Sequence, residues 1–345
     1  MGICHWRGAP WVWVAACLHV GGAQAQQSDV RIYGRIDLGV RHGPINLAAG
    51  EGKEALLDDS SRGRLGYLGS EDLGGGNTAF FQLEHRFNGA AGNQDGDVFW
   101  KDKAWVGLAN QAIGTLRLGR MSSPQDWVGV AGRYEAFFGD SYASNGSRGA
   151  RSAAKWDQTA YYESPTVVGF NLGLAASAAP RNRKDGRGLH LGYAQGPVSL
   201  TFTHQSEQDP TAGATAGDGI KTTTLGGFYD FGVIKPMFTY ARSTGLAAND
   251  QGHQVVWTVG ARIPAGPGEL RLSWRRLKDE LANGSSRAAD REGSRVGLGY
   301  HHPMSKRTSL NVSLVREQVK TFQADGSLKT SYTGPGWEVA LRHNF

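Results

Sequence analysis

The sequence predicts an all-β fold, a transmembrane antiparallel β-barrel of about 16 strands. In the last stretch, residues 336–345, the apolar residues Trp337, Val339, Leu341 and Phe345 stand at every second position, except for a histidine at 343. Of the 345 residues 50 are glycine, about twice the usual share, which suits strands and tight turns better than helices. A terminal strand needs a partner for its open edge, so we expect it to pair with the first strand and close a barrel. Its apolar outer face would lie in a membrane.

Residues 1–25 differ from the rest of the chain. Residues 9–20 are almost entirely apolar, and residues 23–25 (AQA) form a small-x-small cleavage site. We interpret this segment as a secretory signal peptide that precedes a barrel domain at residues 26–345. Cys17 follows small residues, which leaves a lipoprotein signal as the alternative. Both cysteines lie in the segment, so the chain after it can form no disulfide.

The first strands set the inside and the outside of the barrel. Residues 30–41 alternate apolar side chains with Arg31, Arg35 and other polar side chains, and residues 62–71 and 78–87 repeat the pattern after a long loop at 42–60. The inward positions of the first five strands carry seven basic residues: Arg31, Arg35, Arg62, Arg64, Arg86, Lys103 and Arg117.

The alternation continues to the end of the chain. Outward-facing apolar sets lie at residues 104–108, 116–118, 160–162, 170–174, 189–193, 198–202, 225–231, 234–240, 255–259, 270–274, 296–300 and 310–314. With the three early strands and the last one, this makes about 16 strands, an even number as in bacterial outer-membrane barrels. No apolar run after residue 25 approaches the roughly 20 residues of a membrane helix.

Aromatic residues recur at the expected strand ends. They predict girdles at the two membrane interfaces, although aromatic residues are also common in any strand. The set is Tyr33, Phe87, Trp100, Trp156, Tyr162, Tyr229, Phe231, Tyr240, Tyr300, Trp337 and Phe345.

One connection is longer and more apolar than the others. Residues 122–151 combine tryptophan, valine and phenylalanine with three acidic residues, Asp126, Glu135 and Asp140. A loop this apolar needs a surface to pack on. We therefore expect it to fold inward against the barrel wall and narrow the lumen.

Charge along an aqueous lumen decides which ions pass. The seven inward basic residues predict a weak to moderate preference for anions. The alternative is that these charges are largely cancelled by Asp37, Glu84 and the acidic residues of the long loop.

Other functions fit the sequence less well. The ten histidines are scattered, with no nucleophile signature beside them, so an enzyme is not expected. His301 and His302 are adjacent in a strand and would face opposite sides, which argues against a shared metal ion. Residues 74–76 (GGG) precede no helix and are interpreted as a turn rather than a phosphate-binding loop. The basic residues alternate along strands, which argues against nucleic-acid binding. No cofactor or metal is expected.

Several segments resemble the trimeric general porins of Gram-negative bacteria, in particular those of the beta-proteobacteria. They are residues 64–76 (RLGYLGSEDLGGG), 103–108 (KAWVGL), 114–120 (GTLRLGR), 162–165 (YESP) with 169–170 (GF), 305–308 (SKRT) and 341–345 (LRHNF). The resemblance implies a barrel of sixteen strands, a homotrimer, and a third loop whose acidic residues face a basic wall across a constriction. Leu68 and Tyr161 depart from it, since lysine and arginine are common there.

The sequence thus predicts a general diffusion porin in the outer membrane of a Gram-negative cell. It would pass small hydrophilic solutes and ions, with the basic inner residues favouring anions, and contact outer-membrane lipid and lipopolysaccharide. The alternatives are a solute-selective channel for anions, or a barrel that serves mainly as an adhesin or phage receptor through the loops at 42–60, 206–219 and 277–292.

Overall fold

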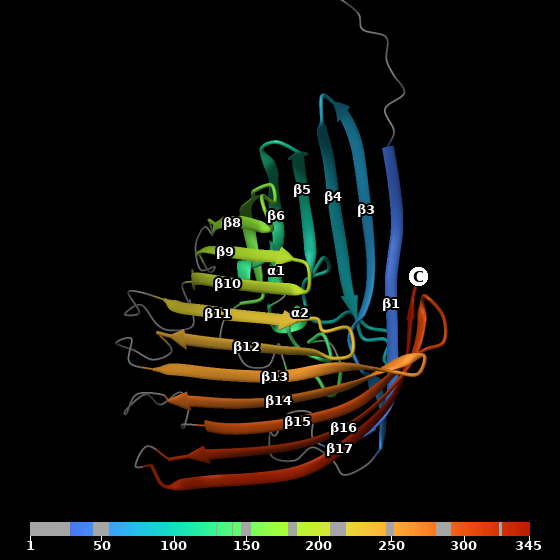
Figure 1. Cartoon of the computed structure of the whole chain (residues 1–345), viewed down its shortest axis with the longest axis vertical. Helices are drawn as coiled ribbons and strands as arrows, with labels where there is room; N and C mark the ends of the chain where they lie inside the picture. The colour runs from blue at the N-terminus through green and yellow to red at the C-terminus, as the bar shows by residue number, and fades with distance from the viewer. Residues whose placement is uncertain are drawn as a thin grey trace, which may run out of the picture.

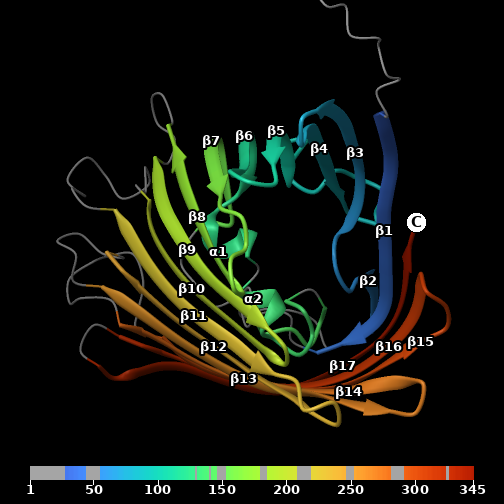
Figure 2. The ribbon, with the colours of Figure 1, turned by 45° about the horizontal axis from the view of Figure 1, so that its top comes forward.

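The chain forms one closed antiparallel β-barrel with a loop folded into it (Figures 1 and 2). The computed structural model describes residues 28–43, 55–128, 130–139, 141–145, 153–178, 185–207, 219–245, 252–280, 291–323 and 326–345. The expected signal peptide lies outside these residues. The strands are β1 Ser28–His42, β2 Leu56–Asp59, β3 Gly63–Gly74, β4 Asn77–Phe87, β5 Lys103–Asn110, β6 Gly114–Ser122, β7 Lys155–Glu163, β8 Phe170–Ser177, β9 Gly186–Gln195, β10 Val198–Glu207, β11 Ile220–Tyr229, β12 Lys235–Thr244, β13 His253–Ala265, β14 Gly268–Glu280, β15 Arg291–Pro303, β16 Thr308–Phe322 and β17 Leu328–Asn344.

Two of the 17 strand segments share one position in the barrel. Strand β2 pairs with β1 through Leu38 and Asp59, and β3 pairs with the same edge of β1 from Arg35 and Arg64 onward. Counting β2 and β3 as one interrupted strand leaves 16, the predicted number. The boundaries differ from the prediction, because residues 56–59 were expected in a loop and instead form the start of this second strand.

The last strand closes the barrel on the first, as predicted. Strand β17 pairs with β1 from Arg35 opposite Asn344 to His42 opposite Trp337. Phe345 continues the pairing, since its backbone and that of Gly34 exchange hydrogen bonds of 3.0 and 3.1 Å. The Phe345 ring lies directly over Gly34, where an added Cβ would come within 2.2 Å of it. The glycine thus leaves room for the terminal aromatic side chain at the closing seam.

We expect Phe345→Ala to weaken this seam. The ring is 41 % exposed, so its loss removes roughly half of a buried aromatic contact, about 1–2 kcal/mol of unfolding free energy. Urea unfolding of the barrel in lipid vesicles measures the effect. Phe231→Ala, in an exposed turn away from the seam, is the control and should cost less. Equal losses for the two variants would contradict a special role of the seam.

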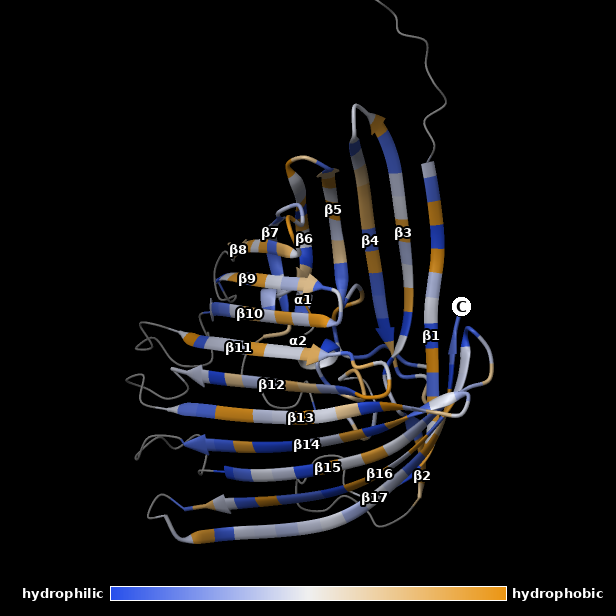
Figure 3. Cartoon of the chain, viewed as in Figure 1, coloured by the Kyte–Doolittle hydropathy of each residue, from blue (hydrophilic) through white to orange (hydrophobic). Residues whose placement is uncertain are grey.

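The outer face is apolar, as the alternation predicts. On β5, for example, Val106 and Leu108 are 56 % and 57 % exposed, while the neighbouring Trp105 faces the inside and is buried. The same alternation of colours runs along the strands in Figure 3. No helix in the described part of the chain is long and apolar enough to cross a membrane.

Two residues of the predicted aromatic girdles face inward instead. The hydroxyl of Tyr33 donates a 2.7 Å hydrogen bond to Glu84 on the lumen side. Trp156 is buried beside Trp105 and Met121. Gln158, with a φ of 50°, interrupts the regular alternation of β7, which explains why counting every second residue misplaced Trp156.

Candidate channel constriction

The described part of the long connection between β6 and β7, residues 123–128, 130–139, 141–145 and 153–154, lies inside the barrel, as predicted, and is called the inner loop below. Its two short helices, α1 Pro124–Trp127 and α2 Val130–Arg133, are surrounded by the ring of strands in Figure 2. At its beginning, Trp127 packs against Tyr161 and Trp105. The Arg117 guanidinium lies 4.4 Å from the Trp127 ring centroid and is 3.1 Å from Glu163. These contacts hold the start of the loop to β5, β6 and β7.

The middle of the inner loop is bound to the barrel wall at strands β10, β12 and β16. The hydroxyl of Tyr134 lies 2.9 Å from that of Ser199 and 2.7 Å from that of Thr201 on β10. Phe137 and Tyr142 pack with Met237 and Val315 of the wall. Burying these apolar side chains is what drives the loop inward.

Two arginines of the barrel wall hold the backbone of the inner loop. Arg262 on β13 donates hydrogen bonds of 3.0 and 2.8 Å to the carbonyls of Ala136 and Glu135, and its guanidinium lies over the Phe138 ring. Arg295 on β15 donates to the carbonyl of Tyr142 and forms a 2.6 Å ion pair with Glu317. The barrel wall therefore holds the inner loop at its beginning, through Trp127, and further along, through Arg262 and Arg295.

Glu135, one of the three predicted acidic residues of the constriction, is fully buried within the inner loop. Its carboxylate accepts hydrogen bonds from the backbone N–H of Phe137 and Gly139 and from the Ser144 hydroxyl. Burial raises the pKa of Glu135, and these backbone hydrogen bonds oppose the rise. The side chain organises the turn at Phe138 and Gly139 and does not face the lumen.

The raised pKa of Glu135 predicts that docking of the inner loop depends on pH. A carboxyl whose pKa is higher in the docked loop stabilises docking at low pH, and this contribution is lost as the pH rises through the raised pKa. We expect open-channel current noise to increase as the pH rises above the usual range of a glutamic acid and through the raised pKa of Glu135. In Glu135→Gln this increase should be absent, whereas Asp126→Asn in the same loop should retain it. A wild-type noise profile in Glu135→Gln would contradict the prediction.

The space between the inner loop and strands β3–β7 is a cavity of about 700 Å³. The loop contributes Trp127, Gly132 and Phe138 to its lining, together with Asp126. The opposite side carries six basic residues, called the basic wall below: Arg64, Arg86, Lys101, Lys103, Arg120 and Lys155. The acidic lining residues are Asp95, Asp102 and Asp126, so the formal balance of the lining is 6 − 3 = +3.

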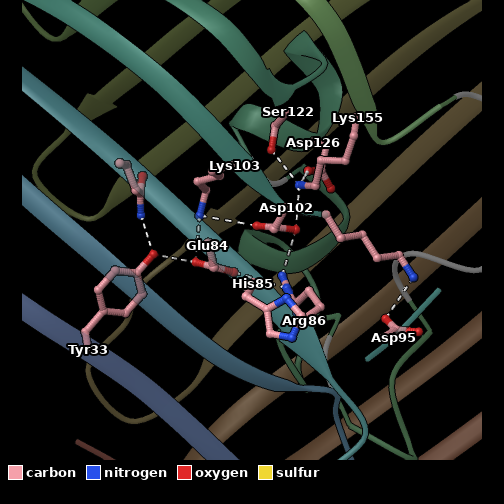
Figure 4. Close-up of polar contacts among 12 residues, drawn as sticks. Tyr33, Glu84, His85, Arg86, Asp95, Asp102, Lys103, Ser122, Asp126 and Lys155 are labelled. Atoms are coloured by element: carbon pink, nitrogen blue, oxygen red, sulfur yellow. Dashed lines mark hydrogen bonds and ion pairs between the residues drawn. The ribbon is translucent and has the colours of Figure 1, made fainter. Parts of the chain in front are cut away.

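The charges of the cavity wall are layered: the carboxylates lie deeper in the protein, and the cations lie nearer the lumen. The side chains of Glu84 and Asp102 are only 2 % and 7 % exposed, whereas those of Arg86 and Lys103 are 17 % and 19 % exposed. Arg86, Lys103 and Lys155 lie 2.9, 3.4 and 3.2 Å from Asp102 and point toward it in Figure 4. Burial alone would raise the pKa of Asp102, but these three cations hold it well below its usual range. The surface that faces the lumen therefore carries more positive than negative charge.

The predicted basic residues do not all reach the cavity. Arg64, Arg86 and Lys103 line it, while Arg62 stands nearby and pairs with Asp59 and Asp95 at 3.0 and 3.8 Å.

The other three predicted basic residues lie elsewhere. Arg31 is exposed and pairs with Asp29, and Arg35 is buried. Arg117 contacts the inner loop, because its guanidinium lies over the Trp127 ring. Of the predicted acidic residues, Asp126 lines the cavity and pairs with Lys155, and Asp140 lies outside the described residues.

Three residues of the basic wall, Lys101, Arg120 and Lys155, are not among the seven predicted basic residues, and Lys101 precedes β5. Counting alternate positions from Leu116 and Leu118 puts Arg120 outward, but the pairing of β6 with β7 shifts between Gly119 and Met121. Gly119, with a φ of 137°, permits this irregularity, and Arg120 lines the cavity. Lys155 begins β7 just after the inner loop, where no alternation had yet been established.

In the described part of the chain, no group of three His, Cys, Asp or Glu residues is placed so that it could hold a metal ion. A closed barrel with an apolar outside, a charged inside and a loop across the lumen defines a membrane channel. Residues 13–321 match the Gram-negative porin family, and the chain belongs to that family. It is an outer-membrane diffusion channel, as the sequence predicted.

Relatives and solved structures agree with this assignment. The chain is 30 % identical to outer membrane porin protein 32 of Delftia acidovorans over 96 % of its own length and 98 % of the relative. It is 28 % identical to an outer membrane porin protein of Bordetella pertussis, over 96 % and 99 % of the two chains.

Two solved structures share the fold across 92 % of this chain. An anion-selective porin from Comamonas acidovorans is 24 % identical, with all of its chain covered and a TM-score of 0.73. The trimer form of OmpT from Vibrio cholerae is 15 % identical, with 99 % of its chain covered and a TM-score of 0.71.

Proposed function

We propose that this porin prefers anions and that its selectivity arises at the basic wall. The layering of charge carries the proposal, since Glu84 and Asp102 are covered by Arg86, Lys103 and Lys155, which stand between them and the lumen. The solved porin from Comamonas acidovorans, described as anion-selective, supports it by analogy. The passage itself is diffusion through water, and the inner loop sets the size limit.

Reversal potentials test this selectivity directly. The folded protein in a planar bilayer, under a roughly tenfold gradient of potassium chloride, should give a reversal potential with the sign of a chloride-preferring pore. Increasing the salt concentration should weaken the preference, because mobile ions screen the wall charges. A potential with the sign of a potassium-preferring pore would overturn the proposal.

We also propose that the channel is a homotrimer whose chain is exported with residues 1–25 as a cleaved signal peptide. The trimer form of the Vibrio structure supports the first part by analogy, and the small-x-small pattern at residues 23–25 supports the second. Mass measurement of the intact complex and N-terminal sequencing of protein from the outer membrane test these two points. An intact mass of a single chain, or a retained leader, would refute them.

The adhesin or phage-receptor role stays open as an alternative. Of the loops on which it depends, residues 44–54, 208–218 and 281–290 lie outside the described residues. A silent but correctly folded barrel in the bilayer would favour that role over diffusion.

A further inference from the structure

Phe138 is an aromatic residue that the inner loop holds in an unfavourable backbone conformation. Its φ of 60° lies in the left-handed region, which a bulky side chain rarely adopts. The Glu135 carboxylate fixes this turn, because it accepts hydrogen bonds from the backbone N–H of Phe137 and of Gly139 on either side. Strain of this kind persists only where the surrounding structure enforces it, and it gathers at functional sites. Glycine or asparagine would adopt the conformation more easily, so a role of Phe138 resides in its ring.

The Phe138 ring faces the cavity of the constriction. It is 45 % exposed, whereas the neighbouring Phe137 is buried in the apolar cluster that docks the inner loop. Gly132 and Gly139 line the cavity together with Phe138, and neither has a side chain that could cover the ring. The ring therefore contributes less than Phe137 to docking of the loop, and it presents an apolar surface to a solute in the cavity.

Each of the two aromatic rings that the inner loop contributes to this cavity lies beside an arginine. The Arg262 guanidinium is 3.3 Å from the centroid of the Phe138 ring, and that of Arg117 is 4.4 Å from the centroid of the Trp127 ring. The hydrogen bonds that Arg262 donates to the loop end on neutral carbonyl groups, which do not neutralise its charge. A cation beside one face of a ring weakens the attraction of that ring for a second cation. These rings therefore suit an aromatic cation poorly.

The basic wall lies on the other side of the same cavity, whose lining has a formal balance of +3. Lys101, for example, lines the cavity with 39 % of its side chain exposed. The cavity volume of about 700 Å³ is within the range of about 300–1,000 Å³ that is usual for small-molecule sites, so it has room for one aromatic ring with surrounding water. A neutral aromatic solute would not use the cations, and an aliphatic anion would not use the rings. The solute that complements both sides is an aromatic anion.

We propose that the constriction retains aromatic carboxylates, with the solute ring against Phe138 and the carboxylate toward the basic wall. Aromatic rings pair in offset-stacked or edge-to-face arrangements, and lysine and arginine bind carboxylates through charge-assisted hydrogen bonds. The basic wall attracts aliphatic and aromatic carboxylates alike, so Phe138 is the residue that distinguishes between them. The inference rests on the proposed anion preference and adds a class of solute to it.

Block of the potassium chloride current by added carboxylates tests this class of solute. In a planar bilayer, the half-blocking concentration of benzoate should be about fivefold lower than that of cyclohexanecarboxylate, which has the same charge and a similar size but no aromatic ring. Benzyl alcohol, which has the ring without the charge, should not block at the concentrations at which benzoate does. Equal half-blocking concentrations of the two carboxylates would overturn the inference, and so would an equally strong block by benzyl alcohol.

The variant Phe138→Leu tests the residue. It should reduce the ratio of the two half-blocking concentrations from about five to about one, because leucine keeps an apolar side chain but has no ring. Phe138→Gly removes the ring and relieves the backbone strain, and it should give the same low ratio, which excludes strain as the cause. The matched control Phe231→Leu removes a 60 % exposed ring from the turn between β11 and β12 and should keep the wild-type ratio. A wild-type ratio in either Phe138 variant would refute the role of Phe138.

The variant Lys101→Gln separates the contribution of charge from that of the ring. It should raise the half-blocking concentrations of both carboxylates by the same factor, because both carry the same charge, and leave their ratio unchanged. A ratio that falls in this variant would contradict the assignment of the discrimination to Phe138. The reversal potential in potassium chloride tests the anion preference itself. Equal block by the two carboxylates in a pore that prefers chloride would therefore refute the aromatic class alone.

Discussion

Arg64→Glu/Lys101→Glu is expected to reverse the ion preference of the channel. Both residues line the cavity beside the inner loop, and reversing two charges changes the formal balance of its lining from +3 to 4 − 5 = −1. Two unit charges 4 Å apart interact by about 1–4 kcal/mol between bulk water and a protein surface. The permeability ratio of chloride to potassium should therefore fall about tenfold, equivalent to about 1.4 kcal/mol.

The matched control reverses two charges outside the lumen. Arg187 and Arg242 are exposed on the outer face of β9 and β12, so Arg187→Glu/Arg242→Glu should leave the reversal potential unchanged. This comparison separates a local effect of the basic wall from the effect of net charge. If both double variants shift the reversal potential equally, or neither shifts it, selectivity does not originate at the basic wall.

How far the sequence predicts the structure differs between the barrel and its lumen. The outer face follows directly from alternation, because each strand must present apolar residues to lipid at every second position. For that reason the strand number and the closing seam at Phe345 were predicted, whereas the inward course of the loop was predicted from its apolar composition. Alternation predicts the structure where one physical requirement applies to every residue of a face.

Inside the barrel no such uniform requirement exists. Gly119 and Gln158 shift the alternation locally, and this moved Arg120 and Trp156 to the side opposite to the one predicted. The acidic residues of the inner loop illustrate a second reason. Composition could not distinguish Asp126, which lines the cavity, from Glu135, which turns back onto its own backbone. That distinction depends on the turn at Phe138, whose positive φ is unusual for its residue type.

Arg295→Ala is expected to destabilise the barrel and release the inner loop. The side chain is completely buried, pairs with Glu317 at 2.6 Å and holds the carbonyl of Tyr142. Removing one partner of a buried ion pair typically costs about 3–5 kcal/mol, part of which Arg275 should offset because it also contacts Glu317. Thermal unfolding should begin at lower temperature, and single channels should become noisier and more conductive. Arg291→Ala, which removes a partly exposed arginine from the same strand, should cost less than Arg295→Ala, because its partner Asp279 keeps the hydrogen bond from Gln254.

A second variant separates the ion pair from the anchoring of the loop. In Arg275→Met/Arg295→Met/Glu317→Leu the three buried charges that contact one another are all replaced by apolar side chains, which often restores the stability of a buried site. The carbonyl of Tyr142 nevertheless loses its donor, so the inner loop keeps one anchor fewer. We therefore expect an unfolding free energy close to that of the wild type together with persistent single-channel noise. Quiet channels in this triple variant would mean that the apolar contacts of Phe137 and Tyr142 suffice to hold the loop, and that Arg295 serves the barrel wall alone.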